Sequence, residues 1–310
     1  AIGELRIVTL LRLDRAKQAR QEIKAYKKAF PKQIEALARF QVEEARVQLR
    51  YGKPKDARKA LEKVIEDFAS SRAAGDAEFY LVEAIEKVGK PDEHLAALIS
   101  FVKNRSDNPH WARANLQLAA LYAEDQDYVS ASRAYVNALN GELEQKERPS
   151  VLAALYEAHR NLRLYDSAIA YARQLVEQYP HDARAQGARI DIGEIYNQKG
   201  SYAEAIKNLV PLLGRLQGDP WSSVQYLIAE SYHKMGDFES GLREYLKLNY
   251  NHQGSVNWIA NSLMGRAECF TALGRESEAI VELEKIKVRF PGDLFAERAD
   301  QMIKTLKLKQ

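Results

Sequence analysis

Residues Ile192–Ala205 read IGEIYNQKGSYAEA, and their spacing of small and aromatic residues predicts two packed helices joined by a tight turn. Gly193 would let a second helix approach the first, and Tyr196 one turn later would fill the space between them. Gly200 would end the first helix, because glycine adopts the left-handed conformation at little cost. Ala205 would then pack in the second helix. Such a hairpin cannot bury its apolar face alone, so the stretch predicts neighbours of the same kind.

The small residue of the second helix recurs at a nearly constant step along the whole chain. Its eight positions are Ala19, Ala57, His94, Ala131, Ala168, Ala205, Gly241 and Ala279, with steps of 36 to 38 residues. This repeat predicts an all-α solenoid of about eight hairpins over residues 1–291. We place the hairpins at 1–37, 38–74, 75–111, 112–148, 149–185, 186–221, 222–259 and 260–291, followed by a closing helix in 292–310.

Turn glycines and two irregular positions refine this division. We expect the turn inside a hairpin to be left-handed at Gly52, Gly89, Gly200, Gly236 and Gly274. His94 stands where the other hairpins have a small residue, so either the third hairpin is splayed or Ala96 or Ala97 packs instead. Pro211 falls inside the second helix of the sixth hairpin, where we expect it to free the carbonyl of Lys207 and bend that helix.

Charge is unevenly distributed along the chain. The 46 Lys and Arg residues nearly balance the 43 Asp and Glu residues, for a net charge of +3. Residues 1–60, however, contain 16 basic and 7 acidic residues. This excess could meet an acidic partner or a phospholipid surface, or it could be a solvated face.

Residues that carry chemistry are scattered. Cys269 is the only cysteine, which excludes an intrachain disulfide and a thiolate metal site. The six histidines lie in different hairpins at spacings that do not suit a metal, and the sequence has no Gly-rich phosphate loop. We therefore expect no catalytic residues, metal site, cofactor or small-molecule substrate, and no nucleic-acid partner.

The beginning of the chain bears on its location. The sequence has neither an apolar run long enough to span a membrane nor a signal peptide. It starts at Ala1 rather than at methionine, and its first residues already have the pattern of a helix interior. We expect the chain to be a fragment, with any targeting segment upstream.

Taken together, the small residue, the aromatic three positions on, the turn glycine, the second aromatic, the alanine and a closing proline resemble the tetratricopeptide repeat (TPR). The resemblance implies a right-handed superhelical solenoid that binds proteins. The copies are longer than the usual repeat of about 34 residues. The phrases YPHDA at 179–183 and AECFTALGR at 267–275 are similar to the variant common in bacterial cell-envelope TPR proteins. These include Tol-Pal-associated, outer-membrane assembly and exopolysaccharide export proteins.

The resemblance implies a non-catalytic scaffold of a bacterial envelope assembly or secretion complex, periplasmic or envelope-associated. A partner protein would lie in the concave groove or along the edge of the solenoid. Membrane association would come through a complex or through an upstream segment. The alternatives are a regulatory subunit that controls a cytoplasmic enzyme or transcription factor, and the scaffold part of a larger multidomain enzyme or membrane protein.

In the TPR family the first helix of each hairpin lines the partner groove. One position past the small residue of that helix, five of the eight hairpins have glutamate: Glu83, Glu157, Glu194, Glu230 and Glu268. This row could bind a basic or polar partner segment. Alternatively, each glutamate pairs with a cation on an adjoining helix, with Lys87, Arg160 and Lys234 suitably placed. The binding hypothesis also includes Arg160, Asn197, His233 and Lys234.

Three tryptophans, Trp111, Trp221 and Trp258, lie at the entrance to a first helix. They could anchor a partner along one rim. Alternatively, they could fix the entrance of that helix onto the preceding one.

Overall fold

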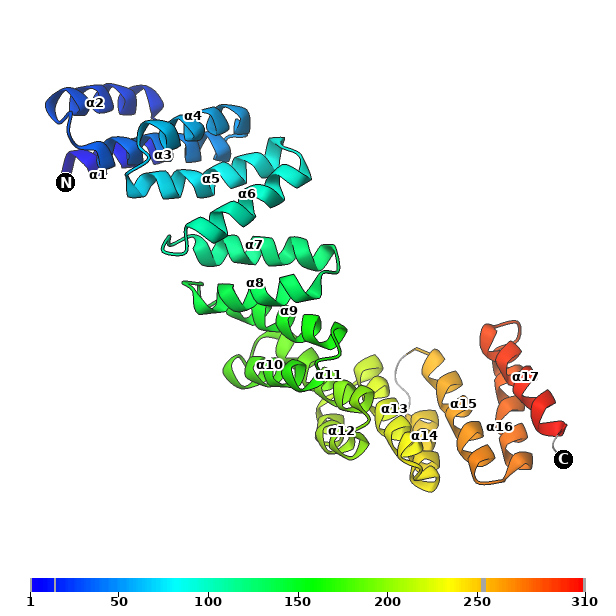
Figure 1. Cartoon of the computed structure of the whole chain (residues 1–310). Coiled ribbons are helices and arrows are strands. Elements are labelled where there is room, and N and C mark those ends of the chain that lie inside the picture. The colour runs from blue at the N-terminus through cyan, green and yellow to red at the C-terminus, as the bar shows by residue number, and fades with distance from the viewer. Residues whose placement is uncertain (1, 14, 252–254, 309–310) are drawn as a thin grey trace. The chain divides into compact units, whose positions relative to one another are not determined.

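The computed structural model describes residues 2–13, 15–251 and 255–308. Within these ranges the chain forms seventeen α-helices, one short 3-10 helix and no β-strand (Figure 1). Successive helices pack side by side along most of the chain. The all-α solenoid predicted from the repeat is confirmed, because its amphipathic helices bury their apolar faces only against neighbouring helices.

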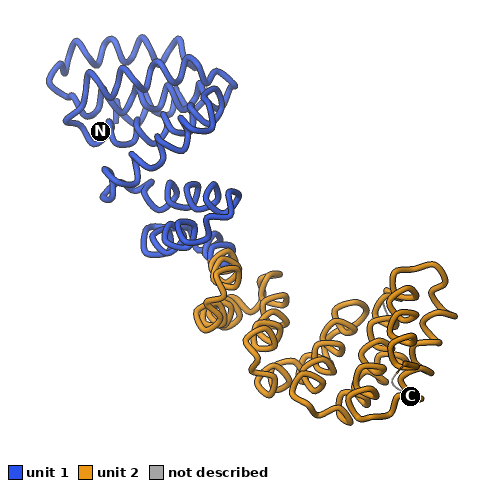
Figure 2. The backbone as a smooth tube through the Cα atoms, turned by 45° about the vertical axis from the view of Figure 1, so that its right-hand side comes forward, with its two compact units in different colours: residues 1–151 blue, residues 152–310 orange. Residues whose placement is uncertain are grey.

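The chain divides into two compact units, residues 1–151 and 152–310 (Figure 2). The division into eight hairpins and a closing helix stays a prediction. None of the helices in the described ranges is both long and apolar enough to cross a membrane.

The first unit contains eight helices, and α9 begins at its end. They are α1 (Ile2–Arg12), α2 (Ala16–Ala29), α3 (Ile34–Arg50), α4 (Pro54–Asp67), α5 (Arg72–Val88), α6 (Pro91–Asn104), α7 (Trp111–Glu124) and α8 (Tyr128–Asn140). Phe79, Phe101, Leu61 and Leu98 are among the side chains that fill the core between α3 and α7.

The second unit contains the remaining helices. They are α9 (Arg148–Asn161), α10 (Tyr165–Gln178), α11 (Ala183–Lys199), α12 (Tyr202–Leu209), the 3-10 helix η1 (Val210–Arg215), α13 (Gly218–Met235), α14 (Phe238–Asn251), α15 (Asn257–Ala272), α16 (Glu276–Arg289) and α17 (Leu294–Lys307). The core between α13 and α17 includes Tyr245, Leu263, Leu283 and Ile303.

The turn at Gly200 has the left-handed geometry that we expected. Its φ is +83°, and the backbone N–H of Ser201 donates to the carbonyl of Tyr196 at 2.8 Å. The same expectation is wrong for Gly89, whose φ is −88°. There the chain runs extended into Pro91, the first residue of α6. In two hairpins Gln126 and Arg163 are left-handed instead, with φ of 60° and 58°.

Small residues allow the closest contacts between helices. A Cβ atom at Gly193 would lie 2.4 Å from the Leu209 side chain, and Ala205 is completely buried in the same contact region. At Gly265 a Cβ atom would lie 2.4 Å from the ring of Tyr245. Because carbon atoms pack best at about 3.5–4.0 Å, neither glycine can be enlarged without moving its neighbour.

We expected Pro211 to bend a long helix, but it does not. The α-helix α12 ends at Leu209, and the chain continues as η1, which has Pro211 near its beginning. Proline has no N–H to donate to the carbonyl of Lys207, so the α-helical ladder ends there and the tighter helix takes over.

His94 is only half-buried, although the corresponding positions in the other hairpins are fully enclosed. Its Nε2 atom is enclosed without a hydrogen-bond partner among the described residues. Of the two alternative residues, Ala97 packs against the core of the first unit and Ala96 is exposed. The third hairpin therefore packs through Ala97 and Leu98.

Candidate functional site

Four glutamates of the sequence row lie on four helices of the second unit, at matching positions. They are Glu157 on α9, Glu194 on α11, Glu230 on α13 and Glu268 on α15. Asp191 joins them, since it lies one turn before Glu194 on α11 and accepts a hydrogen bond from the Tyr156 hydroxyl of α9 at 2.8 Å. We call these five acidic residues, Glu157, Asp191, Glu194, Glu230 and Glu268, the carboxylate face.

Arg160 pairs with the middle of this face. Its Nη2 atom lies 2.7 Å from Oε1 of Glu194, and its Nε donates to Oε1 of Gln198 at 3.2 Å. Asp191 lies 3.9 Å from the same guanidinium. The ion-pair alternative therefore holds for Glu194. A partly exposed pair of this kind stabilises the fold by about 0–1 kcal/mol, so its carboxylate can still exchange partners.

A polar network joins α11 to α13. The Asn197 amide donates to Oγ of Ser231 at 2.9 Å and accepts from Nζ of Lys234 at 3.1 Å. Lys234 also lies 3.2 Å from Oε1 of Glu230. Asn197 is buried and both ends of its amide are used, so it links the two helices and does not face a partner. Lys234 and Glu230 remain accessible at the surface of the network.

The third link of the face joins α13 to α15. Nδ1 of His233 lies 3.8 Å from Oε2 of Glu268, a contact that is an ion pair only when the imidazole is protonated. The Tyr226 hydroxyl lies near both glutamates. Its pKa is raised to about 12, first by burial and then by the charges of Glu230 and Glu268. The two carboxylates thus share one region of negative potential.

Two grooves open at the ends of the carboxylate face. The first has a volume of about 650 Å³ and is lined by Glu157, Arg160, Asn161, Arg163, Tyr165 and Gln198. The second, of about 570 Å³, is lined by Glu268, Thr271, Ala272, Arg298, Gln301, Met302, Thr305 and Leu306. The lining of the second groove is more apolar than polar, a composition suited to a peptide side chain.

Negative charge exceeds positive charge on this face. Glu157 is exposed, yet its pKa is raised because protein atoms displace part of the water around its carboxylate and because Asp191 lies nearby; Arg160 partly offsets this. Against these five carboxylates stand Arg160 and Lys234, which pair with Glu194 and Glu230, and Arg298, which lines the second groove with Glu268. The face therefore favours an added positive charge, which would relieve the repulsion between carboxylates.

Glu83 lies apart from these residues, on α5 of the first unit. It is half-buried, and burial raises its pKa while Arg113 lowers it. The charge of Lys87 lowers the pKa of Glu83 less than that of Arg113 does. Glu83 belongs to the first unit and the other four glutamates to the second, so the carboxylate face is defined within the second unit alone and the row of five stays a prediction.

The tryptophans fix helix entrances. Nε1 of Trp111 donates to the carbonyl of Val102 in the preceding helix at 2.9 Å. Nε1 of Trp258 donates to Oδ1 of Asp219 on α13 at 3.1 Å. Trp221 packs on the core of the second unit and is half-buried. The contact of Trp111 agrees with the stapling alternative, whereas that of Trp258 reaches back to α13 and not to the preceding helix α14.

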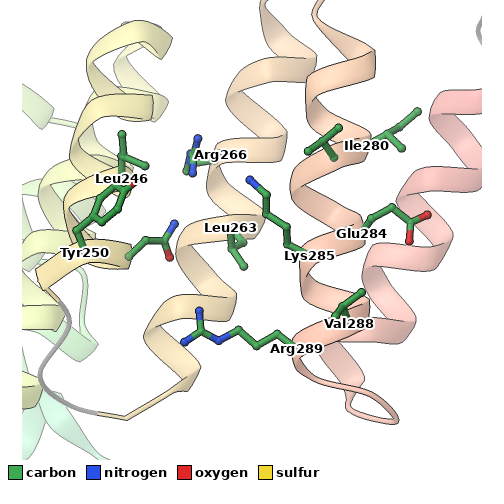
Figure 3. A pocket seen from close by; sticks show the side chains of 11 residues that line it. Leu246, Tyr250, Leu263, Arg266, Ile280, Glu284, Lys285, Val288 and Arg289 are labelled. Atoms are coloured by element: carbon green, nitrogen blue, oxygen red, sulfur yellow. The ribbon is translucent and has the colours of Figure 1, made fainter.

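A further groove lies between α14, α15 and α16, where sequence reasoning found no signal (Figure 3). Its volume is about 620 Å³, and its walls carry Leu246, Leu263 and Val288 together with Arg266, Lys285 and Arg289. Below it, the buried Glu282 pairs with Arg266 at 3.2 Å and with Lys285 at 2.8 Å. Two of the three cations thus neutralise Glu282, which makes this groove a weaker candidate than the carboxylate face.

Within the described ranges, no cluster of three His, Cys, Asp or Glu residues is placed to hold a metal ion. The carboxylate face has the chemistry to hold a cationic or polar segment by hydrogen bonds and charge.

Comparison with known proteins defines the class of the chain. Residues 154–209, which cover most of α9 to α12, match the sequence model of the tetratricopeptide repeat family. The match covers less than a fifth of the chain, and the helix packing over the described residues is that of an α-solenoid. No curated protein sequence matches the chain.

Solved structures align with the chain, and one of them, with a TM-score above 0.5, shows the same fold. The structure of Naa15/Naa10 bound to HypK-THB aligns with a TM-score of 0.58 and 15% identity, over 96% of this chain and 43% of that chain. A tetratricopeptide repeat protein from Parabacteroides merdae aligns with a TM-score of 0.44 and 17% identity, over 87% of this chain and 98% of that one. Yeast Tom70 aligns with a TM-score of 0.46 and 14% identity, over 96% and 60%.

Proposed function

We propose that this protein is a non-catalytic scaffold whose carboxylate face holds a basic or polar segment of a partner protein. The TPR fold is typical of protein–protein interaction. The observation that carries the proposal is the line of five carboxylates across four helices, with Arg160 and Lys234 as its main counter-charges. A lysine or arginine side chain laid along α11 and α13 would meet several carboxylates at once.

The arrangement is also ordered before a partner binds. Arg160 holds Glu194, Lys234 holds Glu230, and Asn197 fixes Lys234 from a buried position. Side chains that are already fixed lose less conformational entropy on binding. The grooves beside Glu157 and Glu268 would take the ends of the bound segment.

The setting that we propose is a bacterial envelope assembly or secretion complex, in the periplasm or at the envelope. This part of the proposal rests on the phrases at 179–183 and 267–275. Under the alternative settings, a cytoplasmic regulatory subunit or part of a larger multidomain protein, the same face would hold a different partner.

The test removes the negative charge and keeps the shape. Glu194, Glu230 and Glu268 are changed together to Gln, and binding of a fluorescein-labelled Lys/Arg-rich peptide is measured by fluorescence anisotropy. We expect affinity to fall by about 10- to 150-fold, since three charged contacts of about 0.5–1 kcal/mol each are lost. Capture of partners by crosslinking from native membranes should fall in parallel.

The matched control changes Glu204, Glu239 and Glu278 to Gln. These exposed glutamates lie on α12, α14 and α16 of the same unit, and they also take part in surface ion pairs. The control removes the same charge but should leave both readouts unchanged. Equal losses in the two variants, or no loss in the first, would contradict the assignment of binding to the carboxylate face.

A further inference from the structure

Helix α2 differs in charge from every other even-numbered helix. Its fourteen residues include five cations, Lys17, Arg20, Lys24, Lys27 and Lys28, and one acid, Glu22. The net charges of α4, α6, α8, α10, α12, α14 and α16 all lie between −1 and +1. These helices have equivalent places in their hairpins, so the basic excess is a property of α2 and not of the repeat.

The cations of α2 lie on its solvent side. Ala19 is completely buried, and Ile23 and Tyr26 pack on the small core beside α1. With about 100° between successive residues, Lys17, Lys24 and Lys28 fall within about 40° of one another, opposite this core. All three are exposed. In Figure 1, α2 lies at the edge of the first unit, and α1 and α3 pack against it.

The glutamates of this region are already used. Glu22 pairs with Arg6 at 2.8 Å, Glu44 with Arg20 at 2.6 Å, and the buried Glu43 with Arg12 at 2.7 Å. Glu35 accepts from the backbone N–H groups of Arg72 and Ala73 at the start of α5.

These glutamates thus bind arginines or backbone N–H groups and not the lysines of α2. Within the described ranges, Lys17, Lys24, Lys27, Lys28 and Lys32 form no ion pair. None of the acids that the structure describes in the first unit therefore pairs with these lysines.

Exposed apolar side chains adjoin this basic stripe. Phe30, which ends α2, is 53% exposed, and Ile34 at the start of α3 is 50% exposed. Lys27, Lys28 and Lys32 flank Phe30 in the sequence. A polyanion without exposed apolar groups, such as a DNA duplex or polyglutamate, would use the lysines alone, whereas a lipid surface would also take up the aromatic ring.

We propose that α2 and the turn after it dock the first unit on an anionic phospholipid surface. The lysine stripe attracts the headgroups, and Phe30 enters the boundary between headgroups and acyl chains. This mode of attachment needs no membrane-spanning helix, and it does not depend on the partner held by the second unit.

The test is cosedimentation of the full chain with vesicles of phosphatidylcholine, with and without phosphatidylglycerol. We expect binding only to the anionic vesicles, and weaker binding at high salt. Changing Lys24, Lys27 and Lys28 together to Gln should lower the partition coefficient by about 150-fold, since each lysine near the surface contributes about 1 kcal/mol. Phe30→Ala should lower it by about fivefold, because about half of a phenylalanine's apolar surface is then lost from the interface.

The control changes Lys55, Lys59 and Lys63 to Gln. These lysines are equally exposed on α4, whose net charge is zero. Their loss should lower partition by less than about fivefold. Equal losses in the two triple variants, unchanged binding of Phe30→Ala, or equal binding to neutral vesicles would each overturn the proposal. Capture of a labelled DNA duplex or polyglutamate by α2, with no vesicle binding, would also overturn it and assign the stripe to that polyanion.

Discussion

The contact between Gly193 and Leu209 allows a prediction in which the sign of a mutational effect depends on tertiary packing. Replacing glycine by alanine inside a helix normally stabilises it by about 0.5–1 kcal/mol. At Gly193 the added Cβ would lie 2.4 Å from the side chain of Leu209, which is completely buried. Overpacking of this kind costs about 1–3 kcal/mol. We therefore expect Gly193→Ala to lower the free energy of unfolding by about 0.5–2 kcal/mol.

The same helix provides the control. Gly187 lies two turns earlier in α11, is exposed, and has open space where a Cβ would be added. Gly187→Ala should therefore stabilise the protein by about 0.5–1 kcal/mol. Urea unfolding followed by far-UV circular dichroism measures both variants, and equal slopes would show that the same surface unfolds.

A double variant tests the cause. Leu209→Ala alone should cost about 2–5 kcal/mol, because it leaves a cavity. Combined with Gly193→Ala, it should cost less than the sum of the single changes, because the new methyl group then enters that cavity. If Gly193→Ala were as stabilising as Gly187→Ala, α11 and α12 would not be in the close contact described, and the reasoning would be refuted.

Two further predictions concern ionisable groups in the second unit. Hydrogen bonds from Lys304 and then Lys287 lower the pKa of Asp300 from 3.8 to about 2. The stability that Asp300 contributes is therefore fully present above pH 3.8 and is lost as the pH falls towards 2. Asp300→Asn should thus make the free energy of unfolding depend less on pH in this window. An unchanged pH dependence would argue against the hydrogen bonds of Asp300 with Lys304 and Lys287. Cys269 is completely buried, and burial raises the pKa of its thiol to about 12. A thiol reagent should modify it only after unfolding in urea, and rapid reaction in native buffer would show that the core between α13 and α17 opens.

Much of the candidate face could be predicted from the sequence, and the missed residues have identifiable causes. The even step of the small residues places Glu157, Glu194, Glu230 and Glu268 on successive odd-numbered helices. Asp191 was missed, although it lies three residues before Glu194 and so on the same side of α11. Asn197 was included because of its position on the helix, but burial and its bond to Ser231 are properties of the packed helices.

The sequence by itself determined the all-α class, because helix periodicity and turn residues act over a few positions along the chain. It also determined the basic excess near the beginning. The tertiary structure decided that Gln126 and Arg163 take left-handed turns without glycine, and that Ala97 replaces His94 in packing. It also decided which charges are compensated, since the partners of Arg160 and Arg20 lie 34 and 24 residues away in the sequence. Pairing of that kind depends on which helices lie side by side, and local pattern carries no information about it.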